Sequence, residues 1–477
     1  MPADMHTVKI IAMKTHRGAP RVWFEGSTPA KSGFEPGMKY SVNKDPDNKG
    51  VLIELCDDGR RTVSGKEYAN GRMVPVLDLN SKADLGMFDG CQSVRAVFRE
   101  GSVYISPVAS EMRRVRRLQR LRDKLLAGRA ISTAGVCAGG GILDHAVHSG
   151  LSDAGVSSYL AMHNEIREDL SNHVIENNDV FCEDSMLLQM PLQELAFDPA
   201  VMSRIGEIDV VSLGLPCSGA SVAGRAKRAL RVPEEHPDVG HLVVAALALI
   251  AKLNPVACIF ENVPLYASSV SAVLIRQQLH DFGYDTHEIE VFGPDFGELE
   301  ARKRWCLAAV TKGIDFDFKT LVPQPFAVRQ LSEVLETGDA VEGRWSQMTG
   351  LKAKQVRDIE AGKGFLMQTY TGEESRINTL TKGIAKNRST DPKIVHPENP
   401  ELLRMPTAVE HARCKGVPEH LIAGLSQTTA HELLGQGIVY KPFRQVAKHL
   451  GAALKRFAMA GVGVIGATRI EPLRAAA

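Results

Sequence analysis

The chain has 477 residues, of which 44% are hydrophobic and 24% charged, and its formal net charge is +1. This length exceeds what one hydrophobic core usually organises, so we expect more than one domain. The near-neutral charge excludes a protein that binds nucleic acid with its whole surface, and any such partner must meet a local basic surface. The sequence has no apolar run that could span a bilayer and no signal-peptide pattern, which predicts a cytoplasmic protein with no membrane partner.

The eight cysteines are scattered along the chain. They form no Cys-x-x-Cys pair and no Cys/His cluster at zinc spacing. This pattern predicts reduced thiols, with neither a disulfide framework nor a metal site.

Residues 1–108 alternate short apolar runs with Gly, Pro, Asn and Asp, which predicts a β-rich N-terminal domain. A β-barrel is one architecture that fits this pattern. Binding of nucleic acid or of a partner and a purely structural role both remain open for this domain. The expected strands cover residues 8–13, 21–24, 39–42, 51–55 and 93–98.

Residues 109–128 predict a basic linker helix. Apolar side chains recur there every three or four residues, as in Leu118, Leu121 and Leu125, and most other positions carry Arg or Lys. Such a charged face is usually solvated, and contact with phosphates is the alternative.

From residue 129 onward, strands and helices alternate, which predicts a parallel sheet with crossover helices. A strand at 131–136 leads into the turn Gly139–Gly141, where the backbone can approach a ligand closely. Glu165 follows the next apolar run at a spacing that suits a ribose diol. Residues 179–184 are expected to form a third strand tip, with acidic side chains near an adenine. Without a phosphate-binding helix signature, this indicates a nucleoside-type cofactor rather than a dinucleotide.

Three further strand ends carry reactive groups. The apolar run 208–214 ends at Pro216 and Cys217, and Pro216 stiffens the turn that holds the thiol. Glu261 ends a second buried strand, an unusual place for a carboxylate. Arg302 and Arg304 are two residues apart and would share one face of a strand. We expect these groups to meet at one edge of the sheet.

Taken together, these motifs resemble those of the cytosine-C5 DNA methyltransferase family, over residues 130–455. Besides Pro216-Cys217, Glu261-Asn262-Val263 and Arg302-x-Arg304, the likeness rests on segments 137–142, 404–418 and 435–438. The resemblance implies an α/β fold: a Rossmann-like S-adenosylmethionine-dependent methyltransferase domain with a small target-recognition region, beside the β-rich domain. The implied domains are 1–108, the linker 109–128, the catalytic 129–312, the target-recognition region 313–400, the catalytic C-terminal part 401–460 and a tail 461–477.

The resemblance also implies roles for single residues. Cys217 would add to C6 of a cytosine flipped out of double-stranded DNA, Glu261 would protonate N3, and Arg304 with Arg302 would hold O2. The protein would act as a monomer, with a cognate restriction endonuclease as a candidate partner. S-adenosyl-L-methionine would be bound by Cys137, Ala138, Gly139, Gly141, Glu165, Asp184, Ser185, Pro216, Gln436 and Gly437.

Several positions depart from the family pattern. Cys137 and Ile142 replace a Phe and a Gly of the first motif, Ser218 and Glu300 each replace a Gln, and Gln436 replaces an Asn. These departures leave two alternatives open: a non-catalytic DNA-binding regulator on a methyltransferase frame, and transfer of a different one-carbon group. A third alternative is a cytosine-C5 methyltransferase acting on tRNA, which would use the same cysteine and glutamate.

Overall fold

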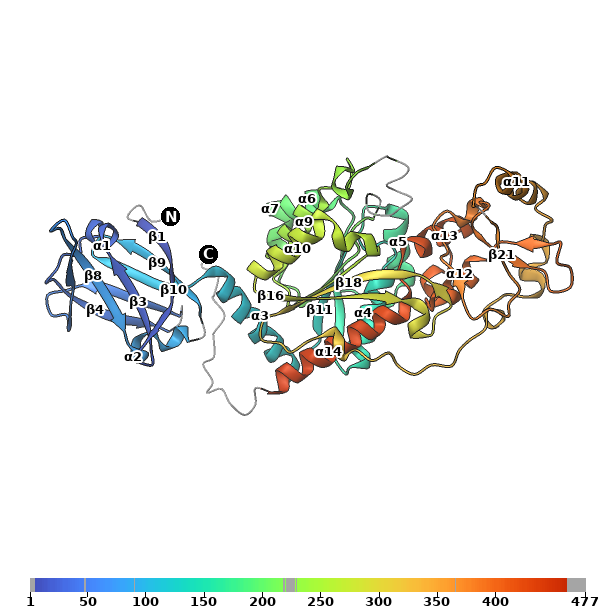
Figure 1. The fold of residues 1–477 in the computed structure, drawn as a ribbon. Coiled ribbons are helices and arrows are strands. Elements are labelled where there is room, and N and C mark those ends of the chain that lie inside the picture. Colours follow the sequence, from blue (N-terminus) through green and yellow to red (C-terminus); the bar gives the residue numbers. More distant parts are fainter. Residues whose placement is uncertain are drawn as a thin grey trace. The chain divides into compact units, whose positions relative to one another are not determined.

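The computed structural model describes residues 5–46, 49–89, 91–217, 219, 228, 230–364 and 366–460 (Figure 1). The predicted tail 461–477, Ser218 and most of the basic segment 223–231 lie outside the described residues. The chain divides into two compact units between Val115 and Arg116. No helix among the described residues has the length and apolar character needed to cross a bilayer.

The first unit consists of two antiparallel sheets around one core. Phe24 and Phe98, from different sheets, meet edge to face with ring centroids 5.2 Å apart. One sheet has the order β1 (Met5–Ala12), β9 (Ser93–Arg99), β10 (Ser102–Pro107), β5 (Gly50–Leu55), β4 (Lys39–Asp45), β6 (Arg61–Thr62). The other has the order β2 (Lys14–His16), β3 (Ala19–Glu25), β8 (Met73–Asn80), β7 (Ser64–Glu67), and the short helices are α1 (Ser27–Lys31) and α2 (Lys82–Leu85). The expected strands are present, and the sheets also contain the unpredicted strands β8 and β10, of eight and six residues, and the short strands β2, β6 and β7.

Helix α3 (Ala109–Leu126) follows, and its cations are used inside the second unit. Arg117 is 1% exposed and donates hydrogen bonds to the carbonyls of Phe282 and Gly283. Arg120 and Lys124 both bind the buried carboxylate of Asp209, at 2.7 and 2.6 Å. For these three residues the predicted solvated or phosphate-binding face is therefore wrong, because they attach α3 to the sheet.

The second unit is built on a seven-stranded sheet. Its order is β13 (Met186–Leu188), β12 (Ser158–Asn164), β11 (Ile131–Val136), β14 (Val210–Leu213), β15 (Ala257–Asn262), β18 (Lys303–Thr311), β16 (Tyr284–Phe292). Neighbours from β13 to β15 are parallel, whereas β18 runs antiparallel to both β15 and β16. The carboxyl ends of β11, β12, β14 and β15 therefore lie along one edge, as predicted.

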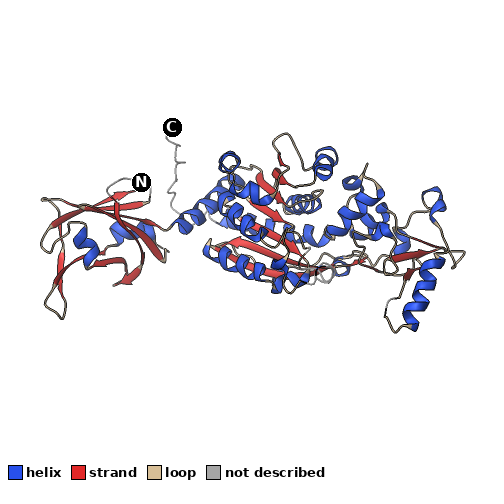
Figure 2. Ribbon diagram, turned by 90° about the horizontal axis from the view of Figure 1, so that it is seen from above, coloured by secondary structure: helices blue, strands red, loops and turns tan. Residues whose placement is uncertain are grey.

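Helices lie on both sides of the sheet (Figure 2). Alternate strand residues point to opposite faces, which gives the sheet two separate cores. In β14, Val210 belongs to one core and Val211 to the other. The first core also contains residues of α3, α4 (Ile142–Asp153) and α14 (Tyr440–Ala460). The second contains residues of α6 (Leu192–Phe197), α7 (Pro199–Arg204), α9 (Leu242–Leu253) and α10 (Val270–Asp281), while α5 (Glu168–Asn177) follows β12.

Residues 313–400 form a smaller module with little regular structure. Helix α11 (Thr349–Glu360) precedes the three-stranded sheet β19 (Gln368–Tyr370), β21 (Pro392–Val395), β22 (Leu403–Arg404). A short parallel pair, β17 (Glu300–Ala301) with β20 (Ile377–Asn378), joins it to the main sheet's last strands. Its own small core includes Leu331, Ile377 and Ile394.

The chain then returns through α12 (Ala408–Lys415) and α13 (Gln427–Gln436) to α14. The late motif is structural at its start: Arg404 donates two 2.7 Å hydrogen bonds to Glu410, and Thr407 and Glu410 cap α12 reciprocally. Helix α14 packs along α4 (Figure 1), so closely that a Cβ at Gly150 would lie 2.2 Å from the carbonyl oxygen of Arg444.

Candidate active site

Cys217 lies four residues beyond β14, at the carboxyl edge of the sheet. The segment that carries it is anchored at two points. The amide of Gly214 donates to the carbonyl of Val136, and the buried side chain of Asn262 donates to the carbonyl of Leu215 at 3.0 Å. The Asn of the Glu261-Asn262-Val263 motif thus ties β15 to the cysteine segment, which fixes the thiol next to the end of β15.

Glu261 and Arg304 form an ion pair on the neighbouring strands. Arg304 Nε lies 2.5 Å from Glu261 Oε1, and the two side chains are 10% and 12% exposed. Burial raises the pKa of Glu261, and the cations of Arg304 and Lys415 offset part of that effect. The carboxyl group is therefore able to hold a proton at higher pH than an exposed glutamate, as general acid chemistry requires.

The Cys217 thiol has a raised pKa. Burial is the main cause, the charge of Glu261 adds to it, and Arg304 and Lys382 act in the opposite direction. The sequence suggested an electropositive site that favours the thiolate, but the two cations are outweighed. Burial and the charge of Glu261 thus both favour the thiol form of Cys217, and the charge of Glu261 links the two groups.

Arg302 does not share the contact that Arg304 makes. It precedes β18, is buried, and donates from Nη2 to the carbonyl of Gly435 at 2.8 Å. Arg302 thus connects the strand end to the last turn of α13, while Arg304 is the arginine beside Glu261. The two arginines therefore have different partners, and a shared contact of both with one substrate oxygen stays a prediction.

Glu300, a departure from the family pattern, has a buried partner. Its Oε2 lies 2.8 Å from Lys415 Nζ, and its Oε1 accepts a hydrogen bond from the amide of Leu380. Both charged side chains are fully buried. Lys415 was not identified from the sequence, because its partner is remote in the chain and the residue sits at an unassigned position of the late motif.

The glycine turn between β11 and α4 has the backbone that a close ligand contact needs. Cys137, Gly139 and Gly141 have positive φ angles of 51°, 58° and 72°. Glu165 accepts hydrogen bonds from the amides of Gly139 (2.8 Å) and Arg167 (3.0 Å). The carboxylate predicted to hold a ribose therefore also fixes the turn, and Ala138 is held by the carbonyl of Asn164.

A buried polar chain that the sequence analysis missed supports this turn from behind. Ser212 donates to Asp144 at 2.5 Å, Asp144 is bonded to His163, and His163 reaches the carbonyl of Gly139. The amide of Asn178 donates to the carbonyls of Gly140 and Gly141. These residues come from four separate segments, so no local motif contains them.

The third strand lies later in the chain than predicted. Residues 179–184 form no strand, and β13 begins at Met186. Asp184 and Ser185 precede β13, and Ser185 donates to the carbonyl of Leu160 in the middle of β12. They are thus remote from the carboxyl edge. Gln189 and Met190 follow β13 there instead, where Asn164 donates to the carbonyl of Met190.

The last motif lies beside the glycine turn, as expected. Gln436 ends α13 and Gly437 follows it. A Cβ at Gly437 would lie 3.4 Å from Ile142, and a Cβ at Gly140 would lie 2.8 Å from the side chain of Leu433. A side chain at position 140 would therefore clash with Leu433.

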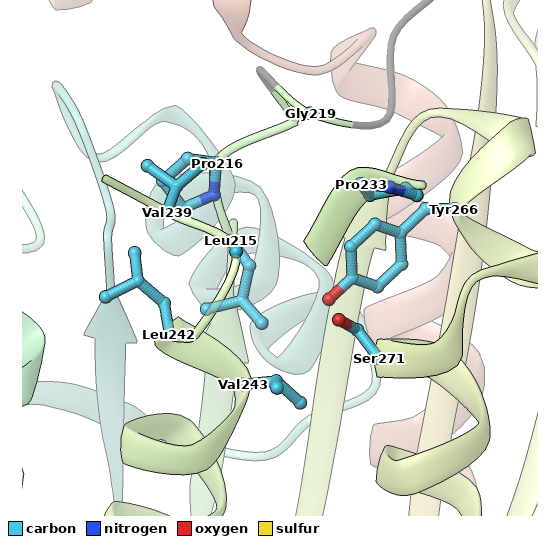
Figure 3. A pocket seen from close by; sticks show the side chains of 10 residues that line it. Leu215, Pro216, Gly219, Pro233, Val239, Leu242, Val243, Tyr266 and Ser271 are labelled. Carbon is cyan, nitrogen blue, oxygen red and sulfur yellow. The ribbon is translucent and has the colours of Figure 1, made fainter. Parts of the chain in front are cut away.

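An apolar pocket lies beside the cysteine segment (Figure 3). Leu215 and Pro216 face Tyr266 and Ser271 across it, and burial raises the pKa of Tyr266 to about 12. Pro216, predicted to contact the cofactor, therefore also packs in this pocket. The remaining lining residues are Gly219, Pro233, Val239, Gly240, Leu242 and Val243.

A sheet that is parallel from β13 to β15 and antiparallel at β18, with a glycine turn after β11, helices on both faces and reactive groups at its edge, is typical of the Rossmann-like, S-adenosylmethionine-dependent methyltransferase fold. Solved structures agree. The Dnmt2 methyltransferase of S. pombe has a TM-score of 0.51 at 16% identity, covering 70% of this chain and 99% of that one. A DNMT2 mutant of Spodoptera frugiperda has a TM-score of 0.53 at 15% identity, covering 67% and 99%.

Residues 136–452 match the family C-5 cytosine-specific DNA methylase, and the chain belongs to this family. The Type II methyltransferase M.MspI of Moraxella sp is 25% identical over 264 residues, which cover 53% of this chain and 58% of that protein. Type II methyltransferase M1.ScrFI of Lactococcus lactis subsp. cremoris is 22% identical over 262 residues, covering 53% and 64%. The chain thus spans less than two thirds of the length of either relative.

Proposed function

We propose that this protein methylates C5 of a flipped-out cytosine in double-stranded DNA, with Cys217 as the covalent nucleophile. The observation that carries the proposal is the anchoring of the Cys217 segment by Asn262 next to the buried Glu261–Arg304 pair. Family membership and the two relatives named Type II methyltransferases support DNA as the substrate.

Cytosine C5 is by itself a poor nucleophile toward a methyl donor, so the enzyme must first activate the base with a nucleophile of its own. Addition of the Cys217 sulfur to C6 makes C5 electron-rich, and a proton delivered to N3 by Glu261 makes this addition easier. Arg304 would hold O2 and stabilise the charge that develops there. After a methyl group has been added to C5, loss of the C5 proton and elimination break the S–C6 bond and release Cys217.

Glu261 acts twice in this scheme. A protonated Glu261 can donate to N3, and it no longer repels a negative charge on sulfur. Because its charge is one cause of the raised pKa of Cys217, protonation of Glu261 also favours the thiolate. The same proton therefore prepares both the base and the nucleophile.

The residues around the glycine turn fit S-adenosylmethionine, which supplies an electrophilic methyl group. The positive-φ backbone at Gly139 and Gly141 lets the chain approach a ligand, and α4 begins there without a side-chain cap. Glu165 would orient a ribose diol with lone pairs that the two amides leave free. Gln189, Met190, Gln436 and Gly437 would complete the cofactor contacts, whereas Asp184 and Ser185 are left out.

Basic residues of the 313–400 module would contact DNA. Lys354 has a carboxylate partner within the module, Asp358, and Lys352 pairs with Glu401, which directly follows the module. Lys382 acts electrostatically on Cys217, which supports a position beside the target base rather than on distant phosphates. The expected pairing with a restriction endonuclease stays a prediction.

Trapping on 5-fluorocytosine tests the proposal, because fluorine at C5 blocks elimination. Full-length protein is incubated with S-adenosylmethionine and a DNA library containing 5-fluorocytosine, and adducts that survive denaturation are weighed by mass spectrometry. We expect protein plus DNA plus one methyl group. The adduct should be lost in Cys217→Ala and kept in the control Cys182→Ala, whose thiol is exposed.

Two results would contradict the proposal. An adduct only with 5-fluorocytosine RNA would establish the tRNA-type substrate. Absence of any adduct, with tight DNA binding retained, would establish the non-catalytic regulator. A trapped mass that differs from one methyl group would instead identify another one-carbon group.

A further inference from the structure

Three metal-ligating side chains meet on the far side of the glycine turn, outside the site described above. His145 Nε2 lies 2.9 Å from Asp179 Oδ1, and His420 Nε2 lies 3.4 Å from the same oxygen. All three ligand atoms lie within 4.8 Å of one another. His145 belongs to α4, Asp179 follows α5, and His420 belongs to the short helix η10 (Glu419–Ile422).

We infer that His145, Asp179 and His420 bind a divalent transition metal ion of the zinc type. Two imidazole nitrogens and one carboxylate oxygen are a common zinc donor set. Tetrahedral coordination at about 2.0–2.1 Å places neighbouring ligand atoms roughly 3.4 Å apart. The His420–Asp179 distance of 3.4 Å matches this value, the His145–Asp179 distance of 2.9 Å is shorter, and the two histidine nitrogens lie within 4.8 Å of each other. Side-chain movements would therefore bring all three atoms onto one ion.

The environment of His145 orients it as a ligand. Its Nδ1 lies 2.5 Å from the hydroxyl of Tyr440, which lies 2.9 Å from the hydroxyl of Ser149. A metal-bound histidine typically donates its second ring N–H to such an oxygen, which fixes the ring and its tautomer. The Tyr440 hydroxyl can accept that hydrogen bond while it donates to Ser149.

The burial of the three side chains is graded from inside to outside. The His145 side chain is 9% exposed, while those of Asp179 and His420 are 70% and 48% exposed. An ion therefore has a route from solvent, and a water molecule can take the fourth position. Among the described residues, this is the one group of three or more His, Cys, Asp or Glu side chains with metal-ligand spacing.

The proposed ion would clamp three segments of the second unit. Asp179 follows Asn178, whose side chain holds the carbonyls of the glycine turn. His420 precedes Leu421, whose carbonyl accepts a hydrogen bond from His173 of α5. Bound metal would thus stiffen the support of the turn without touching the reacting groups. This inference does not depend on the proposed function.

Metal binding by the full-length, tag-free protein tests the inference. Chelator-stripped protein is titrated with Zn²⁺ in competition with a fluorescent indicator, and with Co²⁺ while the visible absorption is recorded. We expect the protein to bind one equivalent of Zn²⁺. With Co²⁺ we expect the visible absorption bands of a four-coordinate, tetrahedral site. Both His420→Ala and Asp179→Asn remove an exposed ligand, so each should fold and should weaken Zn²⁺ binding more than about tenfold.

His280→Ala is the matched control, because His280 is an exposed histidine on α10 whose nearest carboxylate is Asp281. It should bind Zn²⁺ as the wild type does. The inference is overturned if His420→Ala and Asp179→Asn bind as tightly as the wild type, or if the stripped wild type takes up no Zn²⁺. In the latter case the three side chains form only a hydrogen-bonded His–Asp–His group.

Discussion

The pKa of Cys217 depends on burial and on the charge of Glu261. Burial raises the pKa of the thiol and the negative charge of Glu261 raises it further. A neutral side chain at position 261 removes the second cause and leaves the first. Such a change separates the effect of charge from the effect of burial.

We therefore expect Glu261→Gln to lower the pKa of Cys217 while abolishing methyl transfer. The sign follows because thiolate formation no longer places a second negative charge beside a carboxylate. The measurement is the alkylation rate of Cys217 against pH, followed by mass spectrometry of its peptide. Glu290→Gln, an exposed carboxylate paired with Lys303, should leave the midpoint unchanged. A midpoint that rises in Glu261→Gln would contradict the coupling.

A second prediction for single residues concerns the buried ion pair between Glu300 and Lys415. Removing one partner of a buried pair leaves an uncompensated charge, so Glu300→Gln should destabilise the protein by about 3–5 kcal/mol. The double variant Glu300→Gln with Lys415→Met should recover part of that loss, since the Lys415 charge is also removed while the buried Arg302, 3.7 Å from Glu300, still loses its anion. Urea unfolding of the wild type, both single variants and the double variant gives the coupling. Simple addition of the two losses would show that the pair is not coupled.

At the scale of elements, strand prediction succeeded where a run of apolar residues is long and buried. Strands β14, β15 and β18 meet that condition, and so their ends were placed correctly. Strand β13 has only three residues, none of them fully buried, and the apolar Val180 and Phe181 a few residues earlier suggested a strand that does not form. Short edge strands carry too little pattern to locate, and this misplaced Asp184 and Ser185.

Helix α3 was predicted correctly as a helix, but the partners of its cations could not be predicted from the sequence. Its periodicity identified the helix, but a cationic face looks the same whether it meets solvent, phosphate or a buried carboxylate. Asp209, the partner of Arg120 and Lys124, lies at the start of a strand remote in the sequence. The Glu300–Lys415 and His145–Asp179–His420 groups were missed for the same reason, since only the tertiary fold brings their members together.

The crossing of α4 and α14 depends on glycine. A Cβ at Gly150 would lie 2.2 Å from the carbonyl oxygen of Arg444 and 2.8 Å from the amide of Lys448, so the helices would have to separate. We expect Gly150→Ala to destabilise the second unit by about 1–3 kcal/mol, as overpacking does. Gly206→Ala, where nothing lies within 4 Å of the added Cβ, is the control in thermal unfolding. Equal melting temperatures for the two variants would contradict this packing.

At the scale of the whole molecule, the two units have separate cores, and α3 belongs functionally to the second. Burial alone would raise the pKa of Asp209, but Arg120 and Lys124 hold it below its ordinary value. The carboxylate therefore stabilises the folded state above the pKa of an unfolded Asp, and this contribution is lost as the pH falls through the folded-state value. Without α3, Asp209 would be a buried charge with no cation beside it.

Two fragments test this division. Residues 109–477 keep α3 and should fold cooperatively, whereas residues 129–477 lack it and should be insoluble or melt at a clearly lower temperature. Circular dichroism and thermal unfolding of both fragments give the comparison, and Asp209→Asn in the shorter fragment should restore part of the loss. Equal stability of the two fragments would show that α3 is only a linker.

The pairing of α4 with α14 also has a consequence for synthesis of the chain. The central strands and α4 leave the ribosome early, but the helix that covers α4 begins only at Tyr440. At about 5–20 residues per second, the roughly 230 residues between Leu213 and α14 take on the order of ten to fifty seconds to translate. Through that interval the face of α4 that α14 covers in the folded protein is exposed. We therefore expect the nascent chain to be prone to aggregation, and to need chaperones, until α14 has been made.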